Sequence, residues 1–126
     1  MMGRERNATG AIGERIAVAF LKKKGYRITA TNVRTPFGEI DIVARTKDRI
    51  VFVEVKTRRG NSLGPPCISI TEVKKRHIIN NALFYMKRRG LPEAAWRIDV
   101  VSVRLGPMNN VEEIELIENA VQRDGW

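Results

Sequence analysis

The sequence predicts an α/β protein, an α/β/α sandwich in which helices cover both faces of a mixed sheet. Apolar residues recur with the helical period across residues 9–24. Residues 26–56 hold three stretches with alternating apolar and polar side chains, the pattern of an antiparallel meander. Residues 71–103 predict a second helix followed by another strand, which implies a right-handed parallel crossover. The predicted order is therefore helix, three strands, helix, strand.

The first helix has signals at both of its ends. Asn7 or Thr9 can cap the N-terminus, because a short polar side chain accepts a hydrogen bond from the first free N–H groups. Lysines at residues 22–24 and then Gly25 suit the C-terminus, where cations meet the negative end of the helix dipole. The apolar stripe between these ends consists of Ile12, Ile16, Ala17, Phe20 and Leu21. We expect residues 1–8 to be disordered.

Glu14 is the unusual residue of this helix, because it lies at the edge of the apolar stripe. A carboxylate in that position is costly without a cationic partner. One interpretation is an acid that reaches solvent near the helix N-terminus, where the dipole favours it. The other is a carboxylate that points into a functional site.

The three following strands should differ in burial. The first spans residues 26–34 and ends in the turn 35–38, which has proline at its second position. The second is centred on 39–43. The third, 50–56, is apolar at nearly every position up to Glu54, so we expect a central strand covered on both faces. The inward-facing positions expected in the first strand are Tyr26, Ile28 and Ala30.

The second half of the chain begins with a loop over residues 57–69, rich in glycine, proline and arginine. A capping box at 69–72 then opens a helix that ends near residue 89. Residues 96–103 alternate again and predict a strand, while 111–120 fits a helix or an edge strand, of which we favour the strand. The buried stripe of the second helix is expected at Ile79, Ala82, Leu83 and Met86.

Length and charge suggest the kind of partner. We expect one domain over residues 1–126, with 23 Lys and Arg against 14 Asp and Glu and a net charge of +9. That excess favours a polyanion, nucleic acid rather than an anionic membrane surface. The single Cys67 and single His77 exclude a multi-cysteine or multi-histidine metal site. No apolar run approaches the roughly 18 residues of a membrane span, and no signal peptide is present, so we expect a cytoplasmic protein.

The residues with the clearest chemical potential are Asp41, Glu54 and Lys56, which lie on neighbouring predicted strands. Glu54 and Lys56 share one strand face, and Asp41 lies on the adjacent strand. Two carboxylates suit Mg²⁺ or Mn²⁺, which prefer oxygen ligands, and the carbonyl of Val55 is a third candidate ligand. Lys56 could orient a nucleophilic water or stabilise charge on a phosphate, and Glu14 could hold a second ion.

Alternative interpretations exist for these acids. Glu54 and Lys56 could form an ordinary exposed face with an ion pair to Arg45 or Arg49. Glu39 shares a face with Asp41 and could be a ligand, but we favour an ion pair with Arg34 or Arg58.

Basic residues around this cluster could contact nucleic-acid phosphates or could be solvated surface. The second predicted helix is basic outside its apolar stripe, and two arginines follow the third strand. The residues predicted to contact nucleic acid, with DNA favoured over RNA, are Arg34, Arg58, Arg59, Lys74 and Lys75.

Several short motifs together resemble one bacterial family over about residues 10 to 120. They are Gly13-Glu14, Gly25-Tyr26, Asn32-x-Arg34, Gly38-Glu39-Ile40-Asp41, Val51-Phe52-Val53-Glu54-Val55-Lys56-Thr57-Arg58 and Arg97-Ile98-Asp99-Val100-Val101. They resemble the YraN-like proteins, uncharacterised protein family 0102. That family in turn resembles the restriction-endonuclease-like PD-(D/E)XK nucleases, and within them the archaeal Holliday junction resolvases.

This resemblance implies a restriction-endonuclease-like fold with an active site of Glu14, Asp41, Glu54 and Lys56. Ile40 stands where the wider superfamily often has proline, but that proline is not a ligand. The resemblance therefore suggests a Mg²⁺- or Mn²⁺-dependent endonuclease that acts on DNA, including branched or structured DNA. A homodimer would supply the two sites needed to cut both strands of a junction.

Two other classes of function remain open. One is a nucleic-acid-binding module that keeps the nuclease fold without cutting, for which the positive charge is sufficient. The other is an interaction or RNA-associated factor that uses the basic helix 71–89. Asp41, Glu54 and Lys56 discriminate between the classes, because a binding module does not need a buried acid pair.

Overall fold

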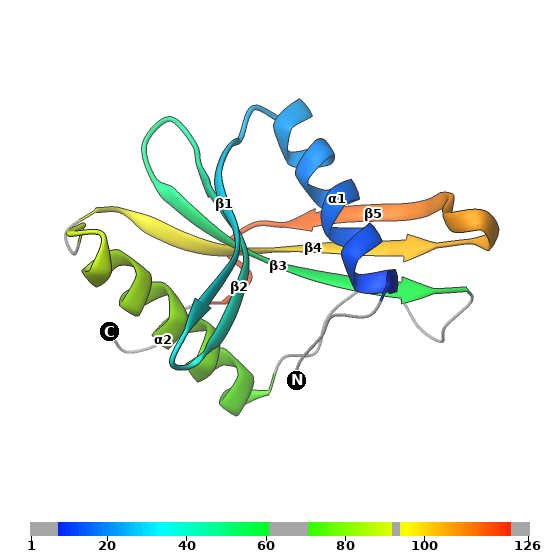
Figure 1. Ribbon diagram of the computed structural model, residues 1–126. Helices are drawn as coiled ribbons and strands as arrows, with labels where there is room; N and C mark the ends of the chain where they lie inside the picture. The colour runs from blue at the N-terminus through cyan, green and yellow to red at the C-terminus, as the bar shows by residue number, and fades with distance from the viewer. Residues whose placement is uncertain (1–7, 61–70, 92–93, 122–126) are drawn as a thin grey trace.

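A computed structural model describes residues 8–60, 71–91 and 94–121. Its centre is a five-stranded sheet in the order β1-β2-β3-β4-β5 (Figure 1). The only parallel pair among these strands is β3 with β4, and the helix α2 lies between them in sequence. A short 3-10 helix, η1 (Pro107–Asn109), connects the last two strands. In chain order the main elements are α1 (Ala8–Lys23), β1 (Arg27–Thr35), β2 (Gly38–Arg45), β3 (Ile50–Arg59), α2 (Glu72–Arg88), β4 (Trp96–Leu105) and β5 (Val111–Ile117).

The two helices cover opposite faces of the sheet and bury a separate core on each face. Strand β3 contributes to both cores, because its side chains alternate: Phe52 packs with α2, and Val51 and Val53 pack with α1. The prediction of a central strand covered on both faces is therefore confirmed. The predicted α/β/α sandwich and order of elements are also confirmed, and this is the arrangement that the resemblance to restriction-endonuclease-like nucleases implies.

Some boundaries differ from the predictions. Strand β3 continues to Arg59, because β4 pairs with it along its whole length, so residues 57–59 are not loop. Helix α1 already includes Ala8, which was expected to be disordered. The strand prediction for 111–120 is confirmed, with β5 at the edge of the sheet. Residues 1–7, Cys67 and the rest of the predicted loop 61–69 lie outside the described residues.

The start and the buried face of α2 also differ. Thr71 is the N-cap, and its hydroxyl accepts a hydrogen bond from the Lys74 N–H at 3.1 Å. The predicted cap, Ser69, lies outside the described residues. Leu83 is 36% exposed, because the buried face is rotated toward Asn81 and Tyr85. The predicted stripe did not include Asn81, which is buried.

Strand β1 changes face part of the way along. Tyr26 and Ile28 pack in the core under α1, as expected, whereas Ala30 packs in the core under α2. The register between β1 and β2 shifts between Ile28 and Ala30, which marks a bulge at Thr29. An extra residue in one strand reverses the alternation that follows it.

No helix in the described ranges is long and apolar enough to cross a membrane.

Helix α1 approaches β3 very closely at Gly13. A Cβ atom added to this glycine would overlap the side chain of Thr57 on β3. Only glycine allows the helix backbone to lie this close to the strand. The contact fixes the height of α1 above the sheet at the residue next to Glu14.

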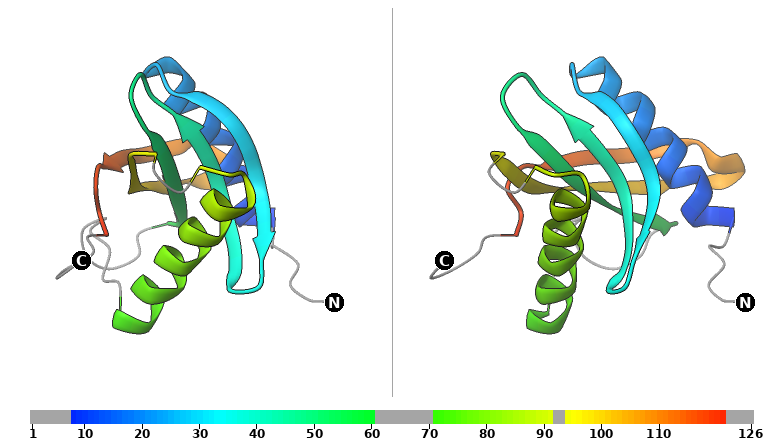
Figure 2. Two further views of the ribbon diagram at one scale, coloured as in Figure 1. Left: turned by 90° about the vertical axis from the view of Figure 1, so that its left-hand side faces the viewer. Right: turned by 60° about the vertical axis from the view of Figure 1, so that its left-hand side comes forward.

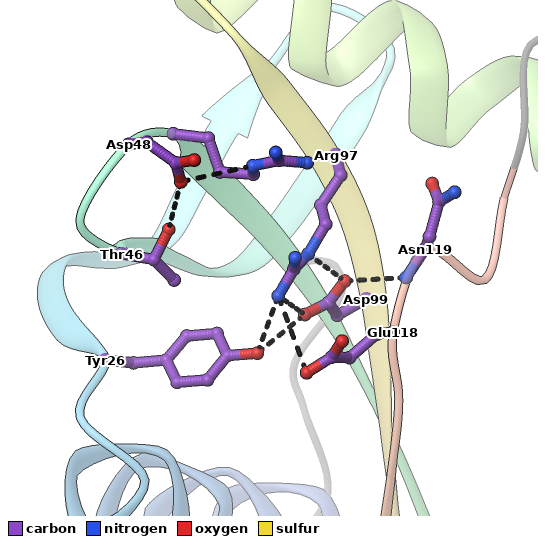
Figure 3. Close-up of polar contacts among 8 residues, drawn as sticks. Tyr26, Thr46, Asp48, Arg97, Asp99, Glu118 and Asn119 are labelled. Carbon is purple, nitrogen blue, oxygen red and sulfur yellow. Dashed lines mark hydrogen bonds and ion pairs between the residues drawn. The ribbon is translucent and has the colours of Figure 1, made fainter.

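A buried polar network joins the start of β1 to β4 and to the residues after β5 (Figure 3). Asp99 is fully buried on β4, where it accepts hydrogen bonds from the Tyr26 hydroxyl at 3.0 Å and the Asn119 N–H at 2.9 Å. Arg97 Nε donates to the same carboxylate at 2.9 Å. Burial, followed by the charge of Asp99, raises the pKa of Tyr26 to about 12. Because the carboxylate is fully hydrogen-bonded, we assign this network to the stability of the fold.

Replacing Gly13 tests the close approach of α1. Gly13→Ala should destabilise the protein by about 1–3 kcal/mol, because the added methyl overlaps Thr57. A loss of stability would be informative, because a glycine-to-alanine change on an exposed helix face raises the free energy of unfolding by about 1 kcal/mol. Urea denaturation measures the difference. In a Thr57→Gly background the penalty should largely disappear, and an equal loss in both backgrounds would contradict this explanation.

Removing the buried acid tests the polar network. Asp99→Ala should lower the free energy of unfolding by about 3–5 kcal/mol, because it leaves Arg97 and Tyr26 without their buried partner. Glu118→Gln is the matched control, since Glu118 lies 3.7 Å from Arg97 and is 59% exposed. The control should change stability by less than about 0.5 kcal/mol. Similar effects of the two changes would contradict a buried structural role.

Candidate active site

The candidate site forms where β2 and β3 separate. Their ladder runs from Arg45 and Ile50 to Ile42 and Val53 and ends there, although β3 continues beside β4. Figure 2 shows the two strands diverging from their connecting turn. Beyond the last pair, the Asp41 carboxylate accepts a hydrogen bond from the Val55 N–H at 2.8 Å. A side-chain oxygen thus replaces the missing backbone acceptor.

This hydrogen bond places Asp41 in the gap between the strands. Ile40 packs in the core under α2 and Ile42 in the core under α1, so Asp41 lies at the change of face. The N–H and C=O of one residue point to the same side of a strand. The carbonyl of Val55 therefore faces the same gap as the Asp41 carboxylate.

Asp41 lies in an acidic environment. Burial is the main cause that raises the pKa of Asp41 to about 8, and the charge of Glu54 is the second. Glu14 and Glu39 raise it further, while the hydrogen bond from Val55 partly opposes the shift. Without a cation Asp41 thus holds a proton near neutral pH, and a bound cation would favour its ionised form.

Glu54 lies on the α2 face of β3, with its side chain 17% exposed. Its carboxylate pairs with Lys74 Nζ at 3.3 Å, and Lys74 comes from the first turn of α2. The expected alternative partners were Arg45 and Arg49, but Arg49 pairs with Asp48 at the β2–β3 turn. Lys56 follows two residues later on the same strand and is exposed. Glu54 is therefore a largely buried acid next to a cation.

Glu14 reaches the cluster from α1. Its carboxylate accepts a hydrogen bond from Asn32 Nδ2 at 2.8 Å, and its charge acts on Asp41. Of the two interpretations of Glu14, this position favours the carboxylate that points toward the site. Helix α1 and the two strands β2 and β3 thus supply acidic groups around the end of the β2–β3 ladder.

The donor set suits a hard cation. Asp41 and Glu54 supply carboxylate oxygens, and Val55 supplies a carbonyl oxygen. Mg²⁺ is usually held by one or two carboxylates together with water and phosphate. Across residues 8–60, 71–91 and 94–121, no three His, Cys, Asp or Glu side chains are grouped so as to hold a metal by themselves. A cation at this position would therefore need the carbonyl, water or substrate as further ligands.

The residues predicted to contact nucleic acid are not gathered at one place. Lys74 pairs with Glu54, whereas Lys75 pairs with Glu72 at 3.3 Å. Arg59 donates to Asn109 at 2.8 Å. Arg58 differs, because its Nη2 atom is buried and has no hydrogen-bond partner in the described part of the chain. Arg34 is exposed on β1 and faces the C-terminal half of α2.

Two asparagines beside the site were not predicted as functional. Asn32 holds Glu14 and has a left-handed backbone with φ of 52°, a conformation that asparagine tolerates better than most residues. Asn81 is buried on α2, hydrogen-bonds with Thr35 and borders a small hollow beside Glu54. The available signal for Asn81 was a polar residue inside an apolar helical stripe.

The fold and the acidic cluster define an α/β/α protein with carboxylates at the point where two central strands separate. The uncharacterised protein family UPF0102 matches residues 13–103, and the chain belongs to this family. A UPF0102 protein of Desulfosudis oleivorans is 50% identical over 116 residues, which are 92% of this chain and 91% of its own length. One of Syntrophotalea carbinolica is 42% identical over 122 residues, 97% of this chain and 98% of its own.

Two solved structures show a distant likeness. The first is “Structure of EndoMS-dsDNA2 complex”, with a TM-score of 0.43 and 17% identity. The likeness covers 85% of this chain and 40% of that chain. The second is “The structure of Pyrococcus Furiosus SfsA in complex with Ca2+”, with a TM-score of 0.37 and 18% identity, covering 90% of this chain and 63% of that chain.

The raised pKa of Asp41 predicts how stability depends on pH. In EDTA, the folded protein keeps a proton on Asp41 up to about pH 8, whereas the unfolded chain loses it near the ordinary value of 3.8. The free energy of unfolding should therefore fall as pH rises through this window. At pH 8, Asp41→Asn should be more stable than wild type by about 1 kcal/mol or more. Near the acidic end of the window, where Asp41 is protonated in both the folded and the unfolded wild type, the two proteins should be equally stable.

Urea denaturation of both proteins at several pH values within this window measures the effect. Asp48→Asn is the control, because it removes an exposed carboxylate at the β2–β3 turn. If Asp41→Asn and Asp48→Asn show the same pH dependence as wild type, the acidic environment of Asp41 does not penalise its ionisation.

Proposed function

We propose that this protein is a Mg²⁺- or Mn²⁺-dependent endonuclease that hydrolyses phosphodiester bonds in DNA. The observation that supports the proposal most directly is the Asp41 carboxylate, held by the Val55 N–H at the end of the β2–β3 ladder and close to Glu54. Two ionised carboxylates crowded together in this way are unfavourable unless a cation lies between them or one of them keeps a proton.

In this proposal Asp41, Glu54 and the Val55 carbonyl hold the cation. A divalent cation bound there would stabilise charge on the phosphoryl oxygens and lower the pKa of an attacking water. Glu14, which Asn32 orients, would hold a second ion or a metal-bound water. The chemistry of these oxygen donors and their positions support these roles.

The two lysines near Glu54 have different proposed roles. Lys56 is exposed on the Glu54 face of β3, where it can orient the nucleophilic water or contact the phosphate. Lys74 now neutralises Glu54 and would be released toward a phosphate when a cation takes its place. Lys56 and Lys74 would therefore keep positive charge at the site with and without a bound cation.

Further parts of the proposal concern substrate and assembly. The net charge of +9 supports a nucleic-acid partner, and we propose DNA, including branched or structured DNA, in the cytoplasm. A homodimer would present two sites with two-fold symmetry, as cutting both strands of a junction requires.

A nucleic-acid-binding module without catalysis is the second candidate. One observation favours it: Glu54 already has a cationic partner in Lys74. In such a protein the ion pair would be a permanent part of the structure, and the basic surface would bind phosphates by counterion release.

Metal binding and cleavage measured together separate the two candidates. Mn²⁺ is titrated by calorimetry into wild type and Asp41→Ala, and both are incubated with a labelled four-way junction, duplex and single strand. We expect Asp41→Ala to lose metal binding and to reduce cleavage by at least about a hundredfold, because the central ligand is gone. Asp48→Ala, which removes an exposed carboxylate, should behave as wild type.

Binding of the uncleaved DNA is measured in EDTA for the same proteins. A nuclease should keep this binding in Asp41→Ala. If wild type binds DNA tightly but neither binds Mn²⁺ nor cleaves any of the substrates, the catalytic proposal is wrong and the binding module is favoured.

A further inference from the structure

A basic groove lies away from the acidic cluster, between the edge strand β1 and the C-terminal half of α2. It consists of two hollows of about 430 Å³ and about 220 Å³ that share Tyr85 and Arg89. Figure 2 shows α2 running beside the β1–β2 hairpin. A hollow of the larger size is typical of a site for a small ligand or for one segment of a larger one.

Four arginines line this groove, and no carboxylate of the described residues neutralises their charge. Arg34 and Arg88 line the larger hollow, Arg45 lines the smaller one, and Arg89 lines both. Among the described residues no carboxylate lines either hollow, and none of these arginines forms an ion pair. By contrast, Arg97 and Arg104 on β4 are each paired with carboxylates. The unpaired charge predicts an anionic ligand.

Aromatic rings border the same groove. The guanidinium of Arg88 lies 5.7 Å from the ring centre of Phe84, and that of Arg89 lies 5.1 Å from the ring centre of Tyr85. Phe37, at the tip of the hairpin, packs edge-to-face with Phe84 at 6.3 Å and is 44% exposed. Rings and guanidinium planes are surfaces on which unpaired bases stack.

We propose that this groove binds an unpaired strand of nucleic acid, with phosphates on the arginines and bases against Phe37 and Phe84. The bases of a duplex are already stacked on one another and are not available to these rings. This inference rests on the proposed function and refines it, because it assigns a single-stranded segment to the substrate.

The position of the groove suits a strand that continues to the acidic cluster. Lys74, which pairs with Glu54, and Arg88 are 14 residues apart on one helix, about 20 Å at the α-helical rise. The hydrogen bond between Thr35 and Asn81 lies between these ends, with Thr35 at the groove and Asn81 beside Glu54. A strand held in the groove would therefore extend along α2 toward the candidate active site.

Binding measured in EDTA tests the groove without cleavage. The probes are a fluorescently labelled single-stranded DNA of mixed sequence and the same strand annealed to its complement, followed by anisotropy. The variants are Arg88→Ala and Phe37→Leu, with Lys87→Ala as the matched control. Lys87 is exposed on the same helix and does not line the groove, so its loss removes equal charge.

We expect Arg88→Ala and Phe37→Leu to weaken single-strand binding about tenfold. Arg88→Ala should also reduce the slope of log affinity against log salt by about 0.7, the value for one lost phosphate contact on a single strand. Duplex binding should change no more than in Lys87→Ala. Circular dichroism and urea denaturation confirm that each variant is folded.

Two results would overturn the inference. The first is that Arg88→Ala and Phe37→Leu bind the single strand as tightly as Lys87→Ala does. The other is an equal loss for single strand and duplex, which would indicate only general attraction to phosphate. Because this assay contains no metal, it is independent of catalysis. The comparison of Asp41→Ala with wild type tests the nuclease proposal separately.

Discussion

The hydrogen bond from the Val55 N–H to the Asp41 carboxylate is the interaction on which the candidate site depends. In an uninterrupted sheet, β2 would supply a backbone acceptor at this position. The ladder ends at Ile42 instead, and the carboxylate satisfies the free N–H group. The same event opens a gap in the sheet, turns the Val55 carbonyl toward it and brings a buried acid beside Glu54. One local irregularity thus satisfies the backbone and gathers oxygen ligands.

Each of the two helices adds one charged side chain beside this gap. Gly13 lets α1 lie against Thr57, and the next residue, Glu14, is held by Asn32. On the other face, α2 begins at Thr71 and places Lys74 on Glu54. Neither helix supplies the acid pair itself. The helices instead hold an acid and a cation next to Asp41 and Glu54. The geometry of the site therefore depends on the packing of both helices against the sheet.

The distribution of arginines divides the molecule into two parts. On β4, Arg97 and Arg104 are paired with acids and hold strands together. Between β1 and α2, Arg88 and Arg89 contact aromatic rings, and no carboxylate of the described residues pairs with them. A net charge of +9 is therefore not spread evenly as solvated surface. Four of the 23 basic residues, Arg34, Arg45, Arg88 and Arg89, lie together beside a groove that opens along the same helix as Lys74.

Periodicity alone determined the helices, the meander and the buried central strand, because hydrophobic burial imposes repeats of 3.6 and two residues on any chain of this fold. The sequence also placed Asp41 and Glu54 on neighbouring strands and Glu14 on the edge of a helix. It could not show the end of the β2–β3 ladder or the bulge in β1, since both depend on which backbone groups pair across strands.

Only the tertiary structure decided the partners of the charged groups. From the sequence, Lys74 was predicted to contact nucleic acid, with a solvated lysine as the alternative; in the structure it is the counter-ion of Glu54. Phe37 and Phe84 are far apart in the chain and were not recognised as a stacking surface, yet their rings meet beside Arg88. Such contacts come from the packing of α2 against the hairpin, and spacing along a single sequence holds no record of the distance between two packed elements.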